Sequence, residues 1–254
     1  STSIPIVTTN NWEEYFTSTF KHHEQAVDKG LHLGKKLLSK LKVRNTVRKD
    51  IFENQKKGKL NSRKLFKAPF NEDVFYRIEK ENYKDIFIHI SLDLSGSMRG
   101  DKLDKTLQTA VAIAYAACNL KGFDVEISLR GTIDSKSNQT PLLAYAFNSR
   151  KHSVKELQKL KRLVTCGMTP EGICLDEVRK NLPRPSYQQE VYLLNISDGL
   201  PNISSMTYNF NTAINHTARI VKEFKRNNIG VLSYYIHDTC DRANTAEHTF
   251  EKMY

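Results

Sequence analysis

From Asp85 onward, the chain alternates between apolar runs of strand length and amphipathic segments of helix length. Strands are predicted at 86–92, 124–132, 141–147, 190–197 and 229–236, and helices at 102–120, 153–163, 174–181 and 211–225. This alternation predicts an α/β fold in which a doubly wound, mostly parallel central sheet carries helices on both faces. The second and third strands lie so close in sequence that we expect an antiparallel hairpin at one edge of the sheet.

The N-terminal part of the chain shows helical periodicity instead. Between residues 12 and 41, apolar side chains recur at spacings of three and four, which predicts a helix. Gly30 and Gly34 lie in the middle of this pattern and weaken it. One interrupted helix and two separate helices therefore both remain open.

A strongly basic segment overlaps the end of this pattern. Residues 35–67 contain thirteen Lys and Arg but only two acidic residues, Asp50 and Glu53, in a chain of net charge +11. We therefore divide the chain into a basic, mainly helical N-terminal extension at 1–80 and an α/β domain at 81–254. Truncation of that domain at its C-terminus remains open, because the sequence ends soon after the last predicted strand.

Such a density of positive charge suits contact with nucleic acid, an acidic protein or a membrane surface, whereas a solvated helical face is the simpler alternative. The candidate basic patch consists of Lys56, Lys57, Lys59, Arg63 and Lys64. Nucleic-acid binding through this segment, with the α/β domain as an accessory, is the second function that we consider.

Composition places the chain among ordinary globular proteins, since 39% of residues are hydrophobic and 26% are charged. No stretch offers the roughly 18 to 20 apolar residues of a membrane-spanning helix. The N-terminal residues lack the basic and apolar regions of a secretory signal, and the four cysteines show no zinc spacing. We therefore expect a cytoplasmic protein.

Two predicted strands end in the same kind of sequence. The first runs into Asp93, Ser95 and Ser97, and the strand at 190–197 runs directly into Asp198. In a doubly wound sheet, ligands bind outside the carboxyl ends of the strands where the strand order reverses. If the two strands are neighbours at that point, their aspartates converge.

Two carboxylates with hydroxyl groups, and without Cys or His, form a set of hard oxygen ligands. Mg²⁺ suits this set best, with Mn²⁺ or Ca²⁺ as alternatives. Because serine hydroxyls are neutral ligands, the ion keeps much of its charge and attracts a carboxylate from outside.

The same residues resemble a known family. Asp93-Leu-Ser95-Gly-Ser97 matches the DxSxS signature of von Willebrand factor A domains. In that family the metal-ion-dependent adhesion site also takes a threonine and a second aspartate from later loops, and Thr169 and Asp198 follow in that order. The resemblance implies a Rossmann-like fold and a site for protein binding.

The resemblance also implies roles for the residues. Ser95, Ser97 and, in the ligand-bound state, Thr169 would coordinate the ion directly, whereas Asp93 and Asp198 would act largely through metal-bound water. The loop around Thr169 reads CGMTPEG where many of these domains carry two glycines before the threonine, so Thr165 is a weaker alternative. Candidate partner contacts are Gly96, Met98, Gly199 and Glu171.

Residues 58–254 further resemble the C-terminal region of the CobT subunit of cobaltochelatase and related proteins that work beside MoxR-type AAA+ ATPases. The resemblance lies in KGKLNSRKLFKAPFNEDVFYRIEKEN, DIFIHISLDLSGSMRG and RPSYQQEVYLLNISDGLPN. It implies an adaptor or subunit of an AAA+ ATPase-linked complex. We expect no catalytic activity of its own, although a non-catalytic role in a cobalt chelatase-like complex remains open.

Catalytic alternatives fit the residues less well. A phosphatase of the haloacid dehalogenase class also begins with an aspartate at a strand end, but it needs a second carboxylate two residues later, where this chain has Ser95. Ser95 and Ser97 are not in a GxSxG turn, and the eight histidines lie in no motif that would supply a base.

Overall fold

The computed structural model describes residues 4–44, 49–67, 74–80, 84–134, 139–198, 201, 210–236 and 243–254. The chain forms two compact units, one made of residues 1–39 and 85–254 and the other of residues 40–84. The predicted metal site belongs entirely to the first unit.

Within the described residues, six strands form the sheet of the first unit, in the order β1-β7-β6-β5-β8-β9. Their bounds are β1 (Val7–Thr9), β5 (Asp85–Asp93), β6 (Phe123–Asp134), β7 (Gln139–Asn148), β8 (Gln189–Ser197) and β9 (Gly230–Tyr235). β6 and β7 pair antiparallel and every other pair is parallel. The predicted mostly parallel sheet and its antiparallel hairpin are therefore confirmed.

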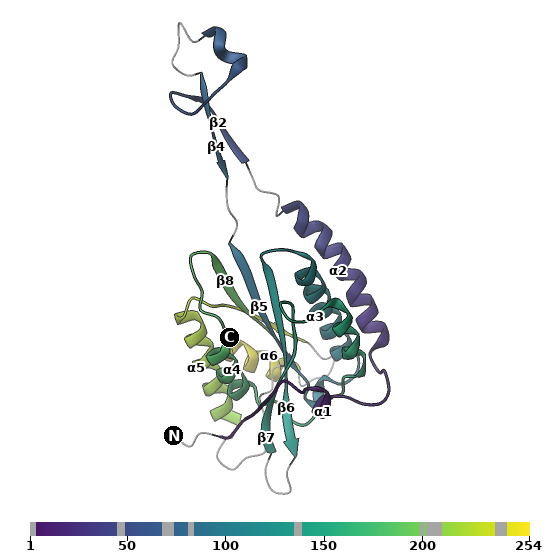
Figure 1. Ribbon diagram of the computed structural model, residues 1–254. Helices are drawn as coiled ribbons and strands as arrows, with labels where there is room; N and C mark the ends of the chain where they lie inside the picture. Colours follow the sequence, from purple (N-terminus) through teal and green to yellow (C-terminus); the bar gives the residue numbers. More distant parts are fainter. Residues whose placement is uncertain are drawn as a thin grey trace. The chain divides into compact units, whose positions relative to one another are not determined.

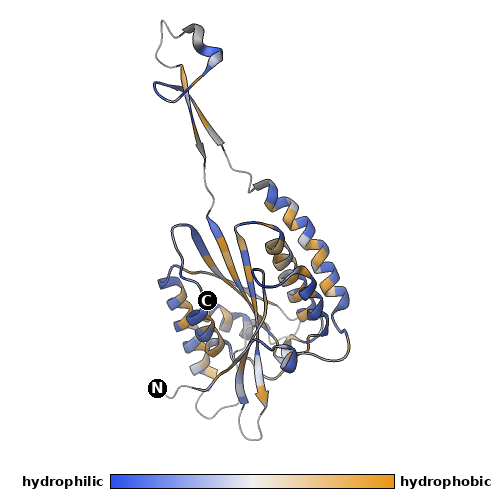
Figure 2. Ribbon diagram, in the orientation of Figure 1, coloured by the Kyte–Doolittle hydropathy of each residue, from blue (hydrophilic) through white to orange (hydrophobic). Residues whose placement is uncertain are grey.

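Helices cover both faces of this sheet (Figure 1). The α-helices are α1 (Glu13–Phe16), α2 (Glu24–Arg44), α3 (Asp101–Asn119), α4 (Glu171–Asn181), α5 (Phe210–Arg226) and α6 (Ala243–Met253). Two short 3-10 helices, η2 (Gly96–Met98) and η3 (Val154–Arg162), lie in the connections. One apolar cluster lies under α3 and η3, and another lies under α4 and α5. Figure 2 shows the hydrophobic residues of β5 and β8 between these layers.

The N-terminal segment belongs to the sheet unit, whereas the sequence analysis placed it in a separate extension. β1 pairs with β7, and the side chains of Trp12, Phe16 and Val27 are buried in the same cluster as α3. The apolar stripe of the N-terminal segment therefore packs against the α/β domain rather than forming a unit of its own.

Gly30 and Gly34 do not interrupt the helix, because α2 runs continuously through both. A Cβ atom at Gly34 would lie 2.7 Å from the Cβ atom of Tyr115 in α3, and one at Gly30 would lie 2.9 Å from that of Val111. The two glycines therefore let the backbones of α2 and α3 approach closely.

We expect Gly34→Leu to lower the free energy of unfolding by about 2 kcal/mol, since the larger side chain overpacks this contact. Lys36→Leu, at an exposed position two residues later in the same helix, is the control and should change it by less than about 0.5 kcal/mol. Urea denaturation measures both. Equal stabilities of the two variants would contradict the close contact between the helices.

The second unit contains a small sheet, in contrast to the helical extension that we expected. Strands β2 (Lys49–Gln55), β3 (Lys59–Leu60) and β4 (Phe75–Lys80) pair antiparallel in the order β2-β4-β3, and the 3-10 helix η1 (Ser62–Lys67) follows β3. Aromatic and β-branched residues in β2 and β4 favour strands over helix. A left-handed turn at Gly58, with φ of 140°, connects β2 to β3.

Candidate functional site

The candidate site lies at the carboxyl end of β5. β5 pairs with β6 on one side and with β8, which comes later in the chain, on the other. The strand order therefore reverses at β5. Asp93 is the last residue of β5 and is fully buried. Asp198 directly follows β8 and is 6% exposed. The two aspartates therefore come from neighbouring strands at the switch point of the sheet.

The turn after β5 is held by the side chain of Asp93. Its Oδ1 atom accepts a hydrogen bond from the backbone N–H of Ser95 over 2.9 Å, a local bond that stabilises the turn. The Oγ atoms of Ser95 and Ser97 lie 3.0 Å apart. Ser95 is buried and Ser97 is exposed, so the hydroxyl pair leads from the buried aspartate to the surface.

The loop that follows η3 and the end of β8 meet this turn. The Ser197 hydroxyl donates to Asp93 Oδ2 over 3.2 Å. The backbone N–H of Gly96 donates to the carbonyl of Gly167 over 3.1 Å, which ties the loop before α4 to the turn. Thr169 lies two residues beyond Gly167 and is 4% exposed. Three separate connections are thus gathered around Asp93.

Several predicted partner contacts take other positions. Gly96 is exposed, as a contact requires, but Met98 and Glu171 are fully buried and offer no side chain to a partner. In the short helix η2, neighbouring side chains point in different directions, so Met98 points into the core. Gly199 lies outside the described residues. Thr165 is half-buried and lines a pocket that is described below.

Burial has an electrostatic consequence for Asp93. It raises the pKa of this carboxyl to about 6; Arg130 opposes the increase and the charge of Asp198 adds to it. The Lys102 ammonium group lies 3.7 Å from Asp198 Oδ2. Asp198 Oδ1 is buried and has no hydrogen-bond partner among the described residues.

A buried arginine lies beneath the two aspartates. Arg130 of β6 has no exposed surface, and its guanidinium group donates to Asn195 Oδ1 over 2.6 Å and to Ser91 Oγ over 2.7 Å. It lies 3.2 Å from Glu171 Oε1 and 3.8 Å from Asp93 Oδ2. Burial opposes its charge, but the carboxylates of Glu171 and Asp93 raise the pKa of Arg130 above its usual value.

The same network extends to Tyr254, which follows α6. The hydroxyl group of Tyr254 donates to Glu171 Oε1 over 2.8 Å and accepts from the amide of Asn195 over 2.5 Å. The sequence analysis did not identify Arg130, although a signal was present. An arginine in the middle of a predicted buried strand requires a buried partner.

The donor set suits Mg²⁺ as the sequence analysis expected. Two carboxylates and two hydroxyl groups follow the ends of two neighbouring strands, and Asp198 Oδ1 has no hydrogen-bond partner among the described residues. A divalent cation would also offset the repulsion between Asp93 and Asp198. No group of three His, Cys, Asp or Glu side chains suited to a metal ion occurs in the described ranges. Because the predicted site depends on hydroxyl oxygens, magnesium binding stays a prediction.

No family model matches the sequence, and no curated protein matches it. The structure is similar to the pilus adhesin SpaC from Lactobacillus rhamnosus GG in its open conformation, with 13% identity, a TM-score of 0.48, and coverage of 82% of this chain and 30% of that chain. It is also similar to the vWF domain of the type V pili tip protein Mfa5 from Porphyromonas gingivalis, with 16% identity, a TM-score of 0.33, and coverage of 57% of this chain and 52% of that chain.

This chain therefore spans less than a third of SpaC and about half of the Mfa5 domain chain. At these identities and TM-scores, neither structure carries an argument about the present site. Among the described helices, none is long and apolar enough to cross a membrane. The strand order and the helices on both faces by themselves show a doubly wound α/β domain of the von Willebrand factor A or Rossmann-like type.

Proposed function

We propose that the chain is a magnesium-dependent protein-binding module whose partner contributes an Asp or Glu side chain. The observation that carries this proposal is the arrangement of Asp93, Ser95, Ser97 and Asp198 at the switch point of the sheet. A bound Mg²⁺ would supply a positive coordination position that a carboxylate can fill. The exposed Ser97 marks the side from which a partner approaches.

In this proposal the carboxylates and the hydroxyl groups of the site have different roles. Asp93 and Asp198 hold the negative charge that attracts the cation, and Ser95 and Ser97 offer neutral oxygens that leave part of the cation's charge for the partner. Thr169, buried in the adjoining loop, is the proposed third hydroxyl ligand. Glu171 instead belongs to the buried network, since its Oε1 atom is paired with Arg130.

A random peptide library tests this proposal. Peptides are selected on the wild-type chain in Mg²⁺ and eluted with EDTA, and we expect them to share one Asp or Glu whose amide counterpart does not bind. The variant Ser95→Ala/Ser97→Ala should lose at least about tenfold in affinity, which corresponds to a loss of about 1.4 kcal/mol. Ser153→Ala, at an exposed helix start without a side-chain capping bond, should bind normally. Selected peptides that bind equally in EDTA, or share no carboxylate, would refute the proposal.

The proposed partner is an AAA+ ATPase or a substrate that such a motor remodels, and the proposed compartment is the cytoplasm. The support for this part is the resemblance of residues 58–254 to the CobT region. A cobaltochelatase-like complex is the form that this resemblance favours. Binding of a purified AAA+ ATPase that is lost on Asp198→Asn and in EDTA is the expected result.

Nucleic-acid binding is the second candidate function, and the surface of the small sheet favours it. Lys57, Lys59 and Arg63 are exposed in this unit, as are the apolar side chains of Phe52 (47%) and Leu60 (48%). Lys64 instead pairs with Glu53 over 2.7 Å. Binding to phosphate groups weakens steeply as salt rises, whereas a metal-bridged contact responds to chelation at constant salt.

A further inference from the structure

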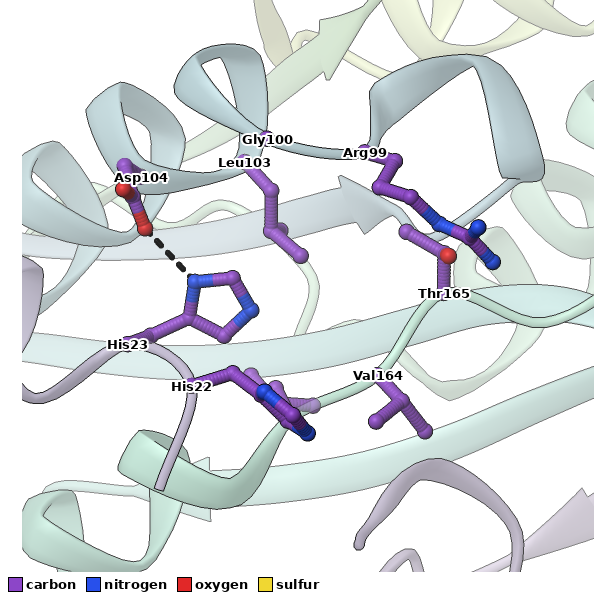
Figure 3. Close-up of a pocket in the computed structure, with 9 residues that line it drawn as sticks. His22, His23, Arg99, Gly100, Leu103, Asp104, Val164 and Thr165 are labelled. Atoms are coloured by element: carbon purple, nitrogen blue, oxygen red, sulfur yellow. Dashed lines mark hydrogen bonds and ion pairs between the residues drawn. The ribbon is translucent and has the colours of Figure 1, made fainter. Parts of the chain in front are cut away.

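A pocket of about 470 Å³ opens beside the turn that carries Ser95 and Ser97. It is lined by the loop before α2, by the start of α3 and by the loop after η3. Figure 3 shows Arg99 and Thr165 at one end of it and His23, joined to Asp104, at the other. The volume is within the range of sites that hold a small molecule or a few side chains.

The walls of the pocket are held by backbone hydrogen bonds between segments far apart in the sequence. The N–H of His23 donates to the carbonyl of Lys161 over 3.0 Å, and the N–H of Val164 donates to the carbonyl of Phe16 over 2.9 Å. The N–H of Cys166 in the same loop donates to Leu94, next to Asp93, over 2.7 Å. The pocket is therefore a preformed hollow that shares its loops with the candidate metal site.

The charges of the pocket favour an anion. Arg99 is exposed, and within the described ranges no ion pair or hydrogen bond engages its guanidinium group. His22 and the Thr165 hydroxyl add two further polar groups. The single carboxylate that lines the pocket, Asp104, is already engaged, because its Oδ1 atom lies 2.6 Å from Nδ1 of His23.

The pocket also has an apolar part. Val164 is half-buried and lines the cavity, with Leu103 and Leu163 also in its wall. The methylene groups of a ligand can therefore pack there while an anionic end reaches Arg99. An aspartate or glutamate side chain combines these two properties.

Arg99 follows Ser97 by only two residues, so a partner segment lying across Ser97 continues toward this pocket. We propose that the pocket binds a second acidic side chain of the partner segment whose first carboxylate lies at Ser95 and Ser97. This inference rests on the proposed function and adds a requirement for the partner sequence: two acidic residues at a fixed spacing.

A position-scanning peptide array tests the inference. Each peptide carries a fixed central Asp, and each of the four positions on either side is varied through all residue types. The array is probed with the labelled wild-type chain, with Arg99→Gln, and with Lys105→Gln as a matched control. Lys105 is exposed on the same helix as Leu103 and does not line the pocket. All three proteins are measured in Mg²⁺ and in EDTA at one salt concentration.

We expect one flanking position to prefer Asp or Glu over Asn or Gln by about tenfold, as a charge-assisted hydrogen bond to Arg99 would give. Arg99→Gln should remove this preference, and Lys105→Gln should keep it. Absence of an acid preference at every position, or a preference that survives Arg99→Gln, overturns the inference.

The measurements in Mg²⁺ and in EDTA distinguish a failure of this inference from a failure of the proposed function on which it rests. If binding requires the central Asp and Mg²⁺ but shows no flanking preference, the proposed function stands and the inference fails. If the Arg99-dependent acid preference is the same in Mg²⁺ and in EDTA, the pocket binds an acidic side chain and the proposed metal-dependent function fails.

Discussion

Replacing Arg130 by Met is expected to lower the free energy of unfolding by about 3–5 kcal/mol, because removing one partner of a buried ion pair leaves the others uncompensated. The guanidinium group lies within 3.8 Å of both Asp93 and Glu171, and all three side chains are fully buried. Methionine fills much of the same volume, so the loss reports mainly on charge and hydrogen bonding. Urea denaturation at pH 7 in EDTA measures it.

A matched variant and a double variant separate charge from packing. Arg150→Met breaks the ion pair between Arg150 and Asp124, whose side chains are 50% and 27% exposed, respectively. It should lower the free energy of unfolding by about 1 kcal/mol or less. Adding Glu171→Gln to Arg130→Met should recover part of the loss, because it removes one of the two uncompensated carboxylates. If Arg130→Met lowers the free energy of unfolding no more than Arg150→Met does, the buried network contributes little to stability.

Replacing Asp93 by Asn should stabilise the protein in EDTA at pH 7 and abolish its stabilisation by Mg²⁺. The pKa of Asp93 is raised to about 6 in the folded protein, from 3.8, chiefly by burial. Above pH 6 the folded state therefore carries an ionised carboxylate that it disfavours. This difference in pKa corresponds to at most about 3 kcal/mol, which the neutral amide avoids.

The direction of the pH dependence follows from the same shift. Between about pH 6 and pH 4, the folded state binds a proton at Asp93 that the unfolded state does not, so wild-type stability in EDTA rises relative to Asp93→Asn as pH falls. Denaturation of both proteins from pH 7 to pH 4 measures the difference. In Mg²⁺ at about 1,000 times its Kd the order should reverse, since the ion then contributes about 4.1 kcal/mol to the wild type alone. A wild type that is more stable than Asp93→Asn in EDTA would contradict a carboxylate held at an energetic cost.

Five of the six described strands of the central sheet, all except β1, could be predicted from the sequence, because an apolar run of strand length is a local feature. The run from Ile86 to Leu92 is apolar except for His89 and Ser91, as is typical of a strand buried on both faces. The short connection at 135–138 predicts the antiparallel hairpin. The convergence of Asp93 and Asp198 followed from one further rule, that ligands gather where the strand order reverses.

The remaining parts depend on contacts between distant residues. Arg130 meets Glu171 and Asn195 only after three connections have been placed, and no local pattern connects them. The buried position of Met98 depends on the direction of a single turn. Gly30 and Gly34 were interpreted as weak points of a helix, because a sequence does not show which helix packs against them.

The pairing of β1 with β7 has a consequence for how the chain is made. Val7 pairs with Leu142, which is 135 positions later, so the edge strand cannot find its place until β7 has left the ribosome. At about 5–20 residues per second, this delay is on the order of 10 s. During that time the apolar side chains of Trp12 and Phe16 have no β6 strand against which to pack. The segment that holds β1 is therefore among the last parts of the sheet to fold, although it is synthesised before the other strands, and shielding by a chaperone matters most there.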